Sequence, residues 1–218
     1  FDGTTLVISG SGNVAIYAAQ KAFEFGAKVV AMSDSNGYIY DSDGIKLDTV
    51  KEIKLDKRGR IKEYIDFHPN AKYHEGCENI WSVPCDVALP CATHNELNGK
   101  SAKMLVKNGC FAVGEGANMP STAEAIEIYR EKKVLFAPAK AANAGGVATS
   151  ALEMSQNSMG LYWSFEEVDN KLEVIMKNIY KNISEAAKEY GCPGDLLTGA
   201  NITGFIKVAD AMLAQGII

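Results

Sequence analysis

The chain has 218 residues, 47% of them apolar and 22% charged, with a formal net charge of −5. This balance excludes an intrinsically disordered chain. With 22 basic against 27 acidic residues, it also excludes a broad basic surface for nucleic acid. No run of about 18 uncharged apolar residues is present, so we expect no membrane span.

The first elements predict a βαβ unit. Residues 4–9 form a β-branched apolar run that is typical of a buried parallel strand, and residues 28–32 form a second one. Between them, residues 14–25 repeat apolar side chains at helical spacing until Gly26 supplies a C-cap. Because the chain starts with Phe1 rather than methionine and enters a strand at once, we expect it to be a piece of a longer protein.

Strands and helices continue to alternate. An Asn-Gly turn at residue 36 precedes a ribbon over 38–40, and residues 46–66 predict an amphipathic helical stretch broken at Gly59. Strands are predicted over 86–89, 111–113 and 134–136, with helices over 100–107 and from a capping box at Ser121 and Glu124 to Lys132. From about residue 141 the pattern is helical, with an apolar stripe on each of the last two helices. The fold class is therefore α/β: a Rossmann-like, doubly wound, mostly parallel sheet with helices on both faces and a helical C-terminal extension.

The turn after the first strand carries a dinucleotide fingerprint. Residues 10–15 read Gly-Ser-Gly-Asn-Val-Ala between a strand and a helix, and Asp34 ends the second strand. Gly10 permits the tight turn, Gly12 lets the backbone approach a pyrophosphate, and Ala15 allows close helix–strand packing. We therefore predict that Gly10, Ser11, Gly12, Asn13 and Val14 bind a dinucleotide; a plain glycine turn is the alternative.

The choice between NAD and NADP depends on the residues around Asp34. Its carboxylate alone favours NAD, because it accepts bonds from the ribose hydroxyl and repels a 2′-phosphate by a few kcal/mol at an effective dielectric of about 20. Ser35 flanks it, and Lys54 and Arg60 lie in a basic segment about twenty residues on. These groups favour NADP, unless the basic segment is only a solvated helix face.

Three polar loops follow the later strands, at the edge where open α/β sheets bind ligands. Ala92 and Thr93 follow the first of these strands, Asn118 the next and Asn143 the last. An amide side chain both donates to and accepts from a carboxamide, as a nicotinamide ring requires. The alternative is that these asparagines only form turns. Ser150 lies two helical turns after Asn143, so both could face the cleft; the alternative for Ser150 is a hydroxyl on a helix face that bonds its own backbone.

Several motifs run in the order found in one known family. They read Gly-Ser-Gly-Asn-Val-Ala, Ser-Asp-Ser-Asn-Gly, Pro-Cys-Ala-Thr-x-Asn, Gly-Glu-Gly-Ala-Asn-Met-Pro and Lys-Ala-Ala-Asn-Ala-Gly-Gly-Val-Ala. The chain closely resembles the C-terminal, coenzyme-binding half of the hexameric glutamate dehydrogenases of bacteria and lower eukaryotes, within the Glu/Leu/Phe/Val dehydrogenase superfamily. The resemblance covers essentially all 218 residues.

The resemblance implies roles for individual residues. Asn13 and Val14 present backbone to the pyrophosphate, and Thr93, Asn118 and Asn143 surround the nicotinamide end. Val147 and Ser150 are implied on the substrate side, with the Ser150 hydroxyl meeting the distal carboxylate of glutamate. The Ser-Asp-Ser run with Lys54 and Arg60 is similar to the NADP-using members. His94 departs from the glutamine usual in the family.

The resemblance also implies a division of labour. It gives an NAD(P)-binding Rossmann-type domain over residues 1–199 and a C-terminal helix over 200–218 that returns to an N-terminal substrate domain. The family's catalytic lysine and aspartate belong to that other domain, so no catalytic residue is expected in this chain. The full enzyme is expected to be a cytoplasmic homohexamer that converts L-glutamate, NADP and water reversibly to 2-oxoglutarate, ammonia and NADPH.

Other functions stay open at the level of sequence. An NAD-dependent glutamate enzyme, a leucine, phenylalanine or valine dehydrogenase, and a free dinucleotide-binding module without chemistry each fit part of the pattern. Ser150 discriminates among the amino-acid substrates, because a polar group suits a side chain that bears a carboxylate. The five irregularly spaced cysteines and three histidines predict reduced cytosolic thiols and no metal site.

Overall fold

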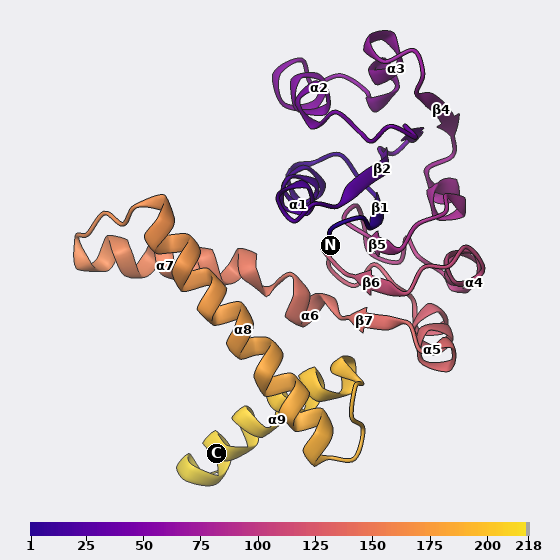
Figure 1. Cartoon of the computed structure of the whole chain (residues 1–218). Coiled ribbons are helices and arrows are strands. Elements are labelled where there is room, and N and C mark those ends of the chain that lie inside the picture. The colour runs from indigo at the N-terminus through magenta and orange to yellow at the C-terminus, as the bar shows by residue number, and fades with distance from the viewer. Residues whose placement is uncertain (217–218) are drawn as a thin grey trace. The chain divides into compact units, whose positions relative to one another are not determined.

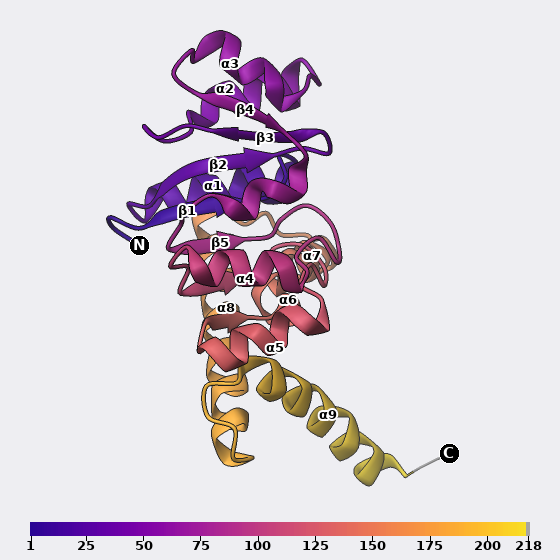
Figure 2. The same cartoon turned by 90° about the vertical axis from the view of Figure 1, so that its right-hand side faces the viewer.

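The computed structural model describes residues 1–216 and contains a seven-stranded sheet. The strands are β1 (Thr5–Ile8), β2 (Lys28–Ser33), β3 (Gly37–Tyr40), β4 (Lys72–Glu75), β5 (Val87–Leu89), β6 (Ala112–Gly114) and β7 (Leu135–Ala137). Their order is β4-β3-β2-β1-β5-β6-β7, and Figure 2 shows β3, β2, β1 and β5 stacked in this sequence. The neighbouring strands β2, β1, β5, β6 and β7 pair in parallel. Strand β3 pairs antiparallel with both of its neighbours, β2 and β4.

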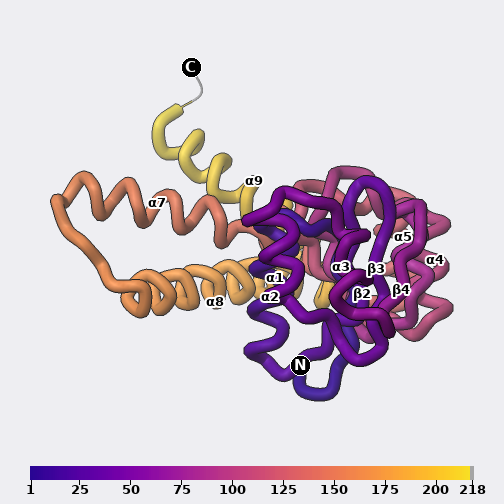
Figure 3. The backbone as a smooth tube through the Cα atoms, turned by 90° about the horizontal axis from the view of Figure 1, so that it is seen from above, coloured from indigo at the N-terminus to yellow at the C-terminus, as the bar shows by residue number. Residues whose placement is uncertain are grey.

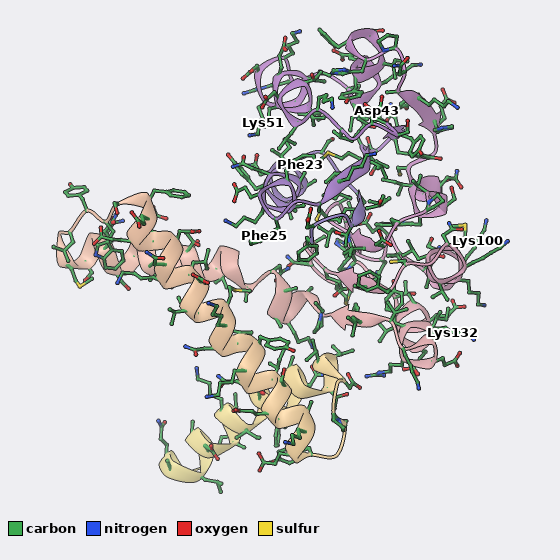
Figure 4. The ribbon with its side chains drawn as sticks, viewed as in Figure 1. Phe23, Phe25, Asp43, Lys51, Lys100 and Lys132 are labelled. Atoms are coloured by element: carbon green, nitrogen blue, oxygen red, sulfur yellow. The ribbon has the colours of Figure 1, made fainter. Side chains whose placement is uncertain are left out.

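Helices cover both faces of this sheet (Figure 1). On one face lie α1 (Asn13–Glu24) and α2 (Leu47–Lys51), and on the other lie α4 (Gly99–Lys107), α5 (Ala123–Lys132) and the 3₁₀ helix η3 (Cys77–Ser82). Figure 4 shows Lys51 and Lys100 on these opposite sides. Each face has its own apolar core, centred on Ile16 and Ile53 on one side and on Trp81 and Tyr129 on the other. The doubly wound α/β prediction is therefore confirmed.

The segment between β3 and β4 is less regular than a single helix. It contains α2, a π-helical turn η1 (Glu52–Asp56), a 3₁₀ turn η2 (Ile61–Glu63) and α3 (Tyr64–Phe67), with the predicted break at Gly59. A buried hydrogen-bond chain holds it together, since the Tyr64 hydroxyl donates to Asp41 at 3.0 Å and accepts from the Lys46 N–H at 2.8 Å. This packing fixes the position of the turn at residues 57–61.

The chain divides into two compact units, residues 1–139 and residues from Lys140 onwards. The second unit is helical, with α7 (Ala144–Met159), α8 (Phe165–Glu189) and α9 (Leu196–Gln215); α6 (Ala139–Ala142) lies at the boundary. Helices α7 and α8 run side by side (Figure 3), and α8 packs against α9. The predicted capping box of Ser164 and Glu167 is present at the start of α8.

One expectation about the helices needs correction. The N-cap of α5 is Thr122, whose hydroxyl accepts from the Ala125 N–H at 3.4 Å, and not Ser121. The main-chain N–H of Ser121 is instead bonded to a carboxylate, as described below. In addition, α9 is long and apolar enough to cross a membrane by length and composition, with a mean hydropathy of 1.2, although it includes Lys207 and Asp210.

Candidate functional site

A cavity of about 770 Å³ opens at the carboxyl ends of β1, β2 and β5. Strand β1 has β2 on one side and β5 on the other, so the connections leave it in opposite directions, which is where open α/β sheets bind their ligands. The structure brings most of the predicted cofactor-binding residues to this cavity: Gly10, Ser11, Gly12, Asn13, Val14, Asp34, Ser35, Lys54, Arg60, Ala92 and Thr93.

The glycine turn has the geometry that its sequence requires. Gly10 has a φ of +86°, and a Cβ there would lie 3.2 Å from the Cys91 carbonyl oxygen. The Gly10 N–H donates to the buried Ser33 hydroxyl at 2.8 Å, which holds the turn against the end of β2. At Gly12 a Cβ would meet no protein atom within 4 Å, so the space beside this backbone is open.

The N-terminus of α1 opens onto the same cavity. Its N-cap, Gly12, makes no side-chain hydrogen bond, and the first turn contains no acidic residue. The first N–H groups of the helix and the positive end of its dipole are therefore not satisfied by a cap, which favours binding of an anion such as a pyrophosphate.

Asp34 is surrounded by donors from its own protein. Its Oδ1 accepts from the Asn36 N–H at 2.9 Å and its Oδ2 from the Ile61 N–H at 3.1 Å. The Arg60 guanidinium lies 3.9 Å from Oδ2, and only 6% of the Asp34 side chain is exposed. Two donors and a nearby cation reduce the negative potential that this carboxylate presents to the cavity.

The predicted basic groups also meet here. Arg60 Nη1 donates to the Ser35 hydroxyl at 2.9 Å while the side chain stays 58% exposed. Lys54 Nζ donates to the Gly59 carbonyl at 2.9 Å. Lys57, from the same segment, does not line the cavity and forms an ion pair with Glu52 at 2.7 Å instead. Lys54, Arg60 and Ser35 thus form a cationic rim next to Asp34.

The Ala92–Thr93 turn is held by a residue that sequence reasoning missed. Glu96 Oε1 accepts from the N–H groups of Ala92 and Thr93 at 3.1 and 3.2 Å, and Glu96 itself lines the cavity. Burial raises the pKa of this carboxyl group, although these hydrogen bonds oppose the shift. Glu96 could have been identified from the sequence, because it lies three residues after Thr93 in a polar loop, close enough to accept bonds from that turn.

Further cavity residues carried no sequence signal. Cys77, Glu78 and Trp81 reach it from η3, which was not predicted, and Cys91 follows β5. Burial raises the pKa of the Cys91 thiol to about 12, so this thiol is neutral at physiological pH. Within residues 1–216, the acidic, cysteine and histidine side chains form no cluster that could hold a metal ion.

Asn118 lies beside the cavity rather than in its wall. It is exposed, in the loop after β6. At Gly116, two residues earlier, a Cβ would lie 2.6 Å from Cys91 Sγ and 3.1 Å from Val14 Cγ1, both of which line the cavity. Gly116 therefore allows this loop to approach the start of α1.

The remaining predicted residues belong to the helical unit. Asn143 is the N-cap position of α7, and Val147 and Ser150 lie on that helix. Val147 is 72% exposed, and the Ser150 hydroxyl donates to the Gly146 carbonyl at 3.4 Å, a long bond that leaves it available to another acceptor. Their roles at the substrate stay predictions.

Comparisons with known proteins agree with the fold. Residues 1–216 match the family model of glutamate/leucine/phenylalanine/valine dehydrogenase. The chain is 56% identical to the glutamate dehydrogenase of Bacteroides thetaiotaomicron, over 99% of this chain and 49% of that protein. It is 54% identical to the NADP-specific glutamate dehydrogenase of Helicobacter pylori (strain J99), over 99% of this chain and 50% of that one.

A solved structure gives the same result. The glutamate dehydrogenase of Plasmodium falciparum matches with a TM-score of 0.95 and 49% identity, over 99% of this chain and 47% of that one. The chain thus spans about half the length of the relatives it matches. With the glycine turn, the sheet order and these matches together, the chain belongs to the glutamate/leucine/phenylalanine/valine dehydrogenase family.

Proposed function

We propose that this chain is the coenzyme-binding half of an NADP-dependent glutamate dehydrogenase. The full enzyme would interconvert L-glutamate, NADP and water with 2-oxoglutarate, ammonia and NADPH. The observation that carries the proposal is the cavity of about 770 Å³, which is lined both by an uncapped helix N-terminus and by a cationic rim. The name of the Helicobacter pylori relative supports the choice of NADP.

The residues fit such a cofactor in chemistry and space. Asn13 and Val14 would receive the pyrophosphate on their main-chain N–H groups, in the open space beside Gly12. Ser35, Lys54 and Arg60 would hold the 2′-phosphate. Thr93, Asn118 and Asn143 would hold the nicotinamide end. When bound, the cofactor supplies hydride transfer, and the chain's part is to orient it.

Glutamate is favoured over an apolar amino acid because of Ser150. Its exposed hydroxyl makes one long intrahelical bond, so it is free to donate to a carboxylate. Val147, one turn earlier, would form the adjacent apolar wall of the substrate site.

The full enzyme is proposed to act as a cytoplasmic homohexamer. Its catalytic lysine and aspartate would come from an N-terminal substrate domain, to which α9 (Leu196–Gln215) would return. Phe205 and Leu213 on α9 are 72% and 84% exposed and would pack in that assembly.

Fluorescence titration of this chain with NADPH and NADH tests the proposal. We expect NADPH to bind more tightly at low salt, and its advantage to shrink as salt screens the rim. Tighter binding of NADH would overturn the NADP assignment and favour an NAD enzyme. Binding of neither would overturn the coenzyme-binding role itself.

A further inference from the structure

Glu115 is a buried carboxylate without a role in the proposed chemistry. It follows β6 directly and is only 4% exposed. A buried carboxylate is costly unless it is hydrogen-bonded. Here Oε1 accepts from the Ser121 N–H at 3.0 Å and Oε2 from the Ala139 N–H at 2.7 Å. Both oxygens are thus bonded to main-chain donors.

The first of these bonds closes a loop. Ser121 lies six residues after Glu115, so the carboxylate joins the two ends of the segment that has Asn118 near its middle. The Gly116 and Ala117 N–H groups donate to the Pro90 carbonyl at 3.0 and 2.9 Å. The loop is therefore also held against the segment that leads to Ala92 and Thr93.

The loop carries a strained residue next to Asn118. Met119 has a φ of +49°, a left-handed conformation that is unfavourable for a side chain of this kind. Such a conformation persists only where the surrounding structure enforces it. The Asn95 N–H bond to the Met119 carbonyl, at 3.0 Å, and the closure by Glu115 provide that enforcement.

The second bond fixes another segment. Ala139 is the last residue of the sheet unit and the first of α6, and the chain reaches Asn143 four residues later. The carboxylate is therefore anchored at the end of the sheet unit while it closes the loop that carries Asn118.

We propose that Glu115 is a positioning residue for the nicotinamide end of the cofactor: its carboxylate is anchored by the Ala139 N–H and closes the loop through the Ser121 N–H, and so it sets where Asn118 lies. The inference rests on the proposed function. Glu115 does not touch the cofactor itself. Its effect should therefore fall on the nicotinamide half of the dinucleotide and spare the adenosine half, which the glycine turn and the Arg60 rim would hold.

The test compares two ligands on one variant. Glu115→Gln keeps the shape of the side chain but turns an NH₂ group toward one of the two N–H donors. NADPH contains the nicotinamide, whereas 2′,5′-ADP carries only the adenosine end. We expect the variant to bind NADPH at least about tenfold more weakly and 2′,5′-ADP within about twofold of the unmodified chain.

The matched control is Asp41→Asn. Asp41 is also 4% exposed, and its two oxygens accept from the Tyr64 hydroxyl and the Asp43 N–H. Asp41 lies outside the loops expected at the nicotinamide end. Asp41→Asn should therefore change the affinities for NADPH and 2′,5′-ADP by the same factor, if it changes them at all. Glu115→Asp provides a second variant, because it keeps the charge but is too short to reach both donors, and it should show the same selective loss.

The outcomes separate the two proposals. Suppose that the unmodified chain binds both 2′,5′-ADP and NADPH. If the Glu115 variants then weaken the binding of both ligands equally, or of neither, Glu115 only supports the fold and the inference is overturned. If the unmodified chain binds neither ligand, the proposed function fails, and the inference fails with it.

Discussion

At the scale of single residues, hydrogen bonds to the Asp34 carboxylate reduce the negative charge that the cavity would present to a 2′-phosphate. Asp34 would repel a 2′-phosphate if its charge faced the cavity alone, but the Asn36 and Ile61 N–H groups already bond both of its oxygens. The donor from Ile61 has no sequence signature, because it lies 27 residues away and belongs to the main chain. The prediction that an aspartate at the end of the second strand favours NAD therefore could not include this Ile61 hydrogen bond.

Replacing both Lys54 and Arg60 with alanine should weaken NADPH binding and leave NADH binding nearly unchanged, because the NADH ribose carries no charge there. Two fully made contacts would contribute roughly 3–6 kcal/mol, and the 58% exposure of Arg60 reduces this to about 1–3 kcal/mol. Titration of the double variant measures the effect. Lys57→Ala, which removes a lysine of the same segment outside the cavity, should leave both affinities unchanged.

Ser150→Val in the full-length enzyme should raise KM for glutamate and relax selection against norvaline-like substrates. The substrate carboxylate would lose a charge-assisted bond of about 1.5–3 kcal/mol. Ser155→Ala is the control on the same helix, since its hydroxyl bonds the Ala151 carbonyl at 2.8 Å. Equal kinetics for Ser150→Val and the unmodified enzyme would show that Ser150 is only a helix-face hydroxyl.

Glu96→Gln should change the pH dependence of stability. Burial raises the pKa of Glu96 in the folded chain, so its contribution to stability is fully present below the unfolded pKa and is lost as the pH rises through the folded pKa. The unmodified chain should therefore lose stability relative to Glu96→Gln as the pH rises above about 4, near the unfolded pKa of glutamate. Urea unfolding at several pH values measures this difference, with the exposed Glu131→Gln as the control for loss of one charge.

At the scale of elements, the helix–strand alternation could be predicted because apolar periodicity marks each buried strand and helix face. Strand β4 and the 3₁₀ helix η3 could not be predicted in this way. Three of the four β4 residues are exposed, so it lacks a buried face, and η3 is too short for a helical period. Three cavity residues, Cys77, Glu78 and Trp81, therefore had no predicted element to place them.

The start of α5 offers a test between two neighbouring hydroxyls. Thr122→Ala should cost about 1 kcal/mol of stability, because it removes the N-cap bond to the Ala125 N–H. Ser121→Ala should cost less than Thr122→Ala, because the Ser121 hydroxyl makes no cap bond and only lies next to the Tyr129 hydroxyl. Chemical denaturation of both variants measures this, and a larger loss at Ser121 would restore the capping box expected from the sequence.

At the scale of the whole molecule, the sheet unit has two closed cores whereas the helical unit leaves large apolar side chains uncovered. Besides Phe205 and Leu213 on α9, Tyr162 and Phe165 are 95% and 87% exposed. The apolar stripes of the last two helices were predictable from their helical spacing, but the sequence does not say which of these side chains are exposed.

This chain should bind NADPH without oxidising glutamate, because we propose that the lysine and aspartate that perform the chemistry belong to another domain of the full enzyme. The assay follows NADPH formation from glutamate and NADP, with the chain produced in a host that lacks its own glutamate dehydrogenase. Turnover that co-purifies with the chain at constant specific activity would contradict the prediction and place catalytic groups among these 218 residues.

The hydrogen bond from the Ile61 N–H to Asp34 has a consequence for protein engineering. The acid and the basic rim form one hydrogen-bonded unit, so coenzyme preference is not encoded at position 34 alone. An exchange of the turn at residues 57–61 for one of different length would remove the Ile61 donor and the Arg60 guanidinium together and leave Asp34 with the Asn36 N–H alone. Redesign toward NAD should therefore begin by grafting this turn, with the aspartate left in place.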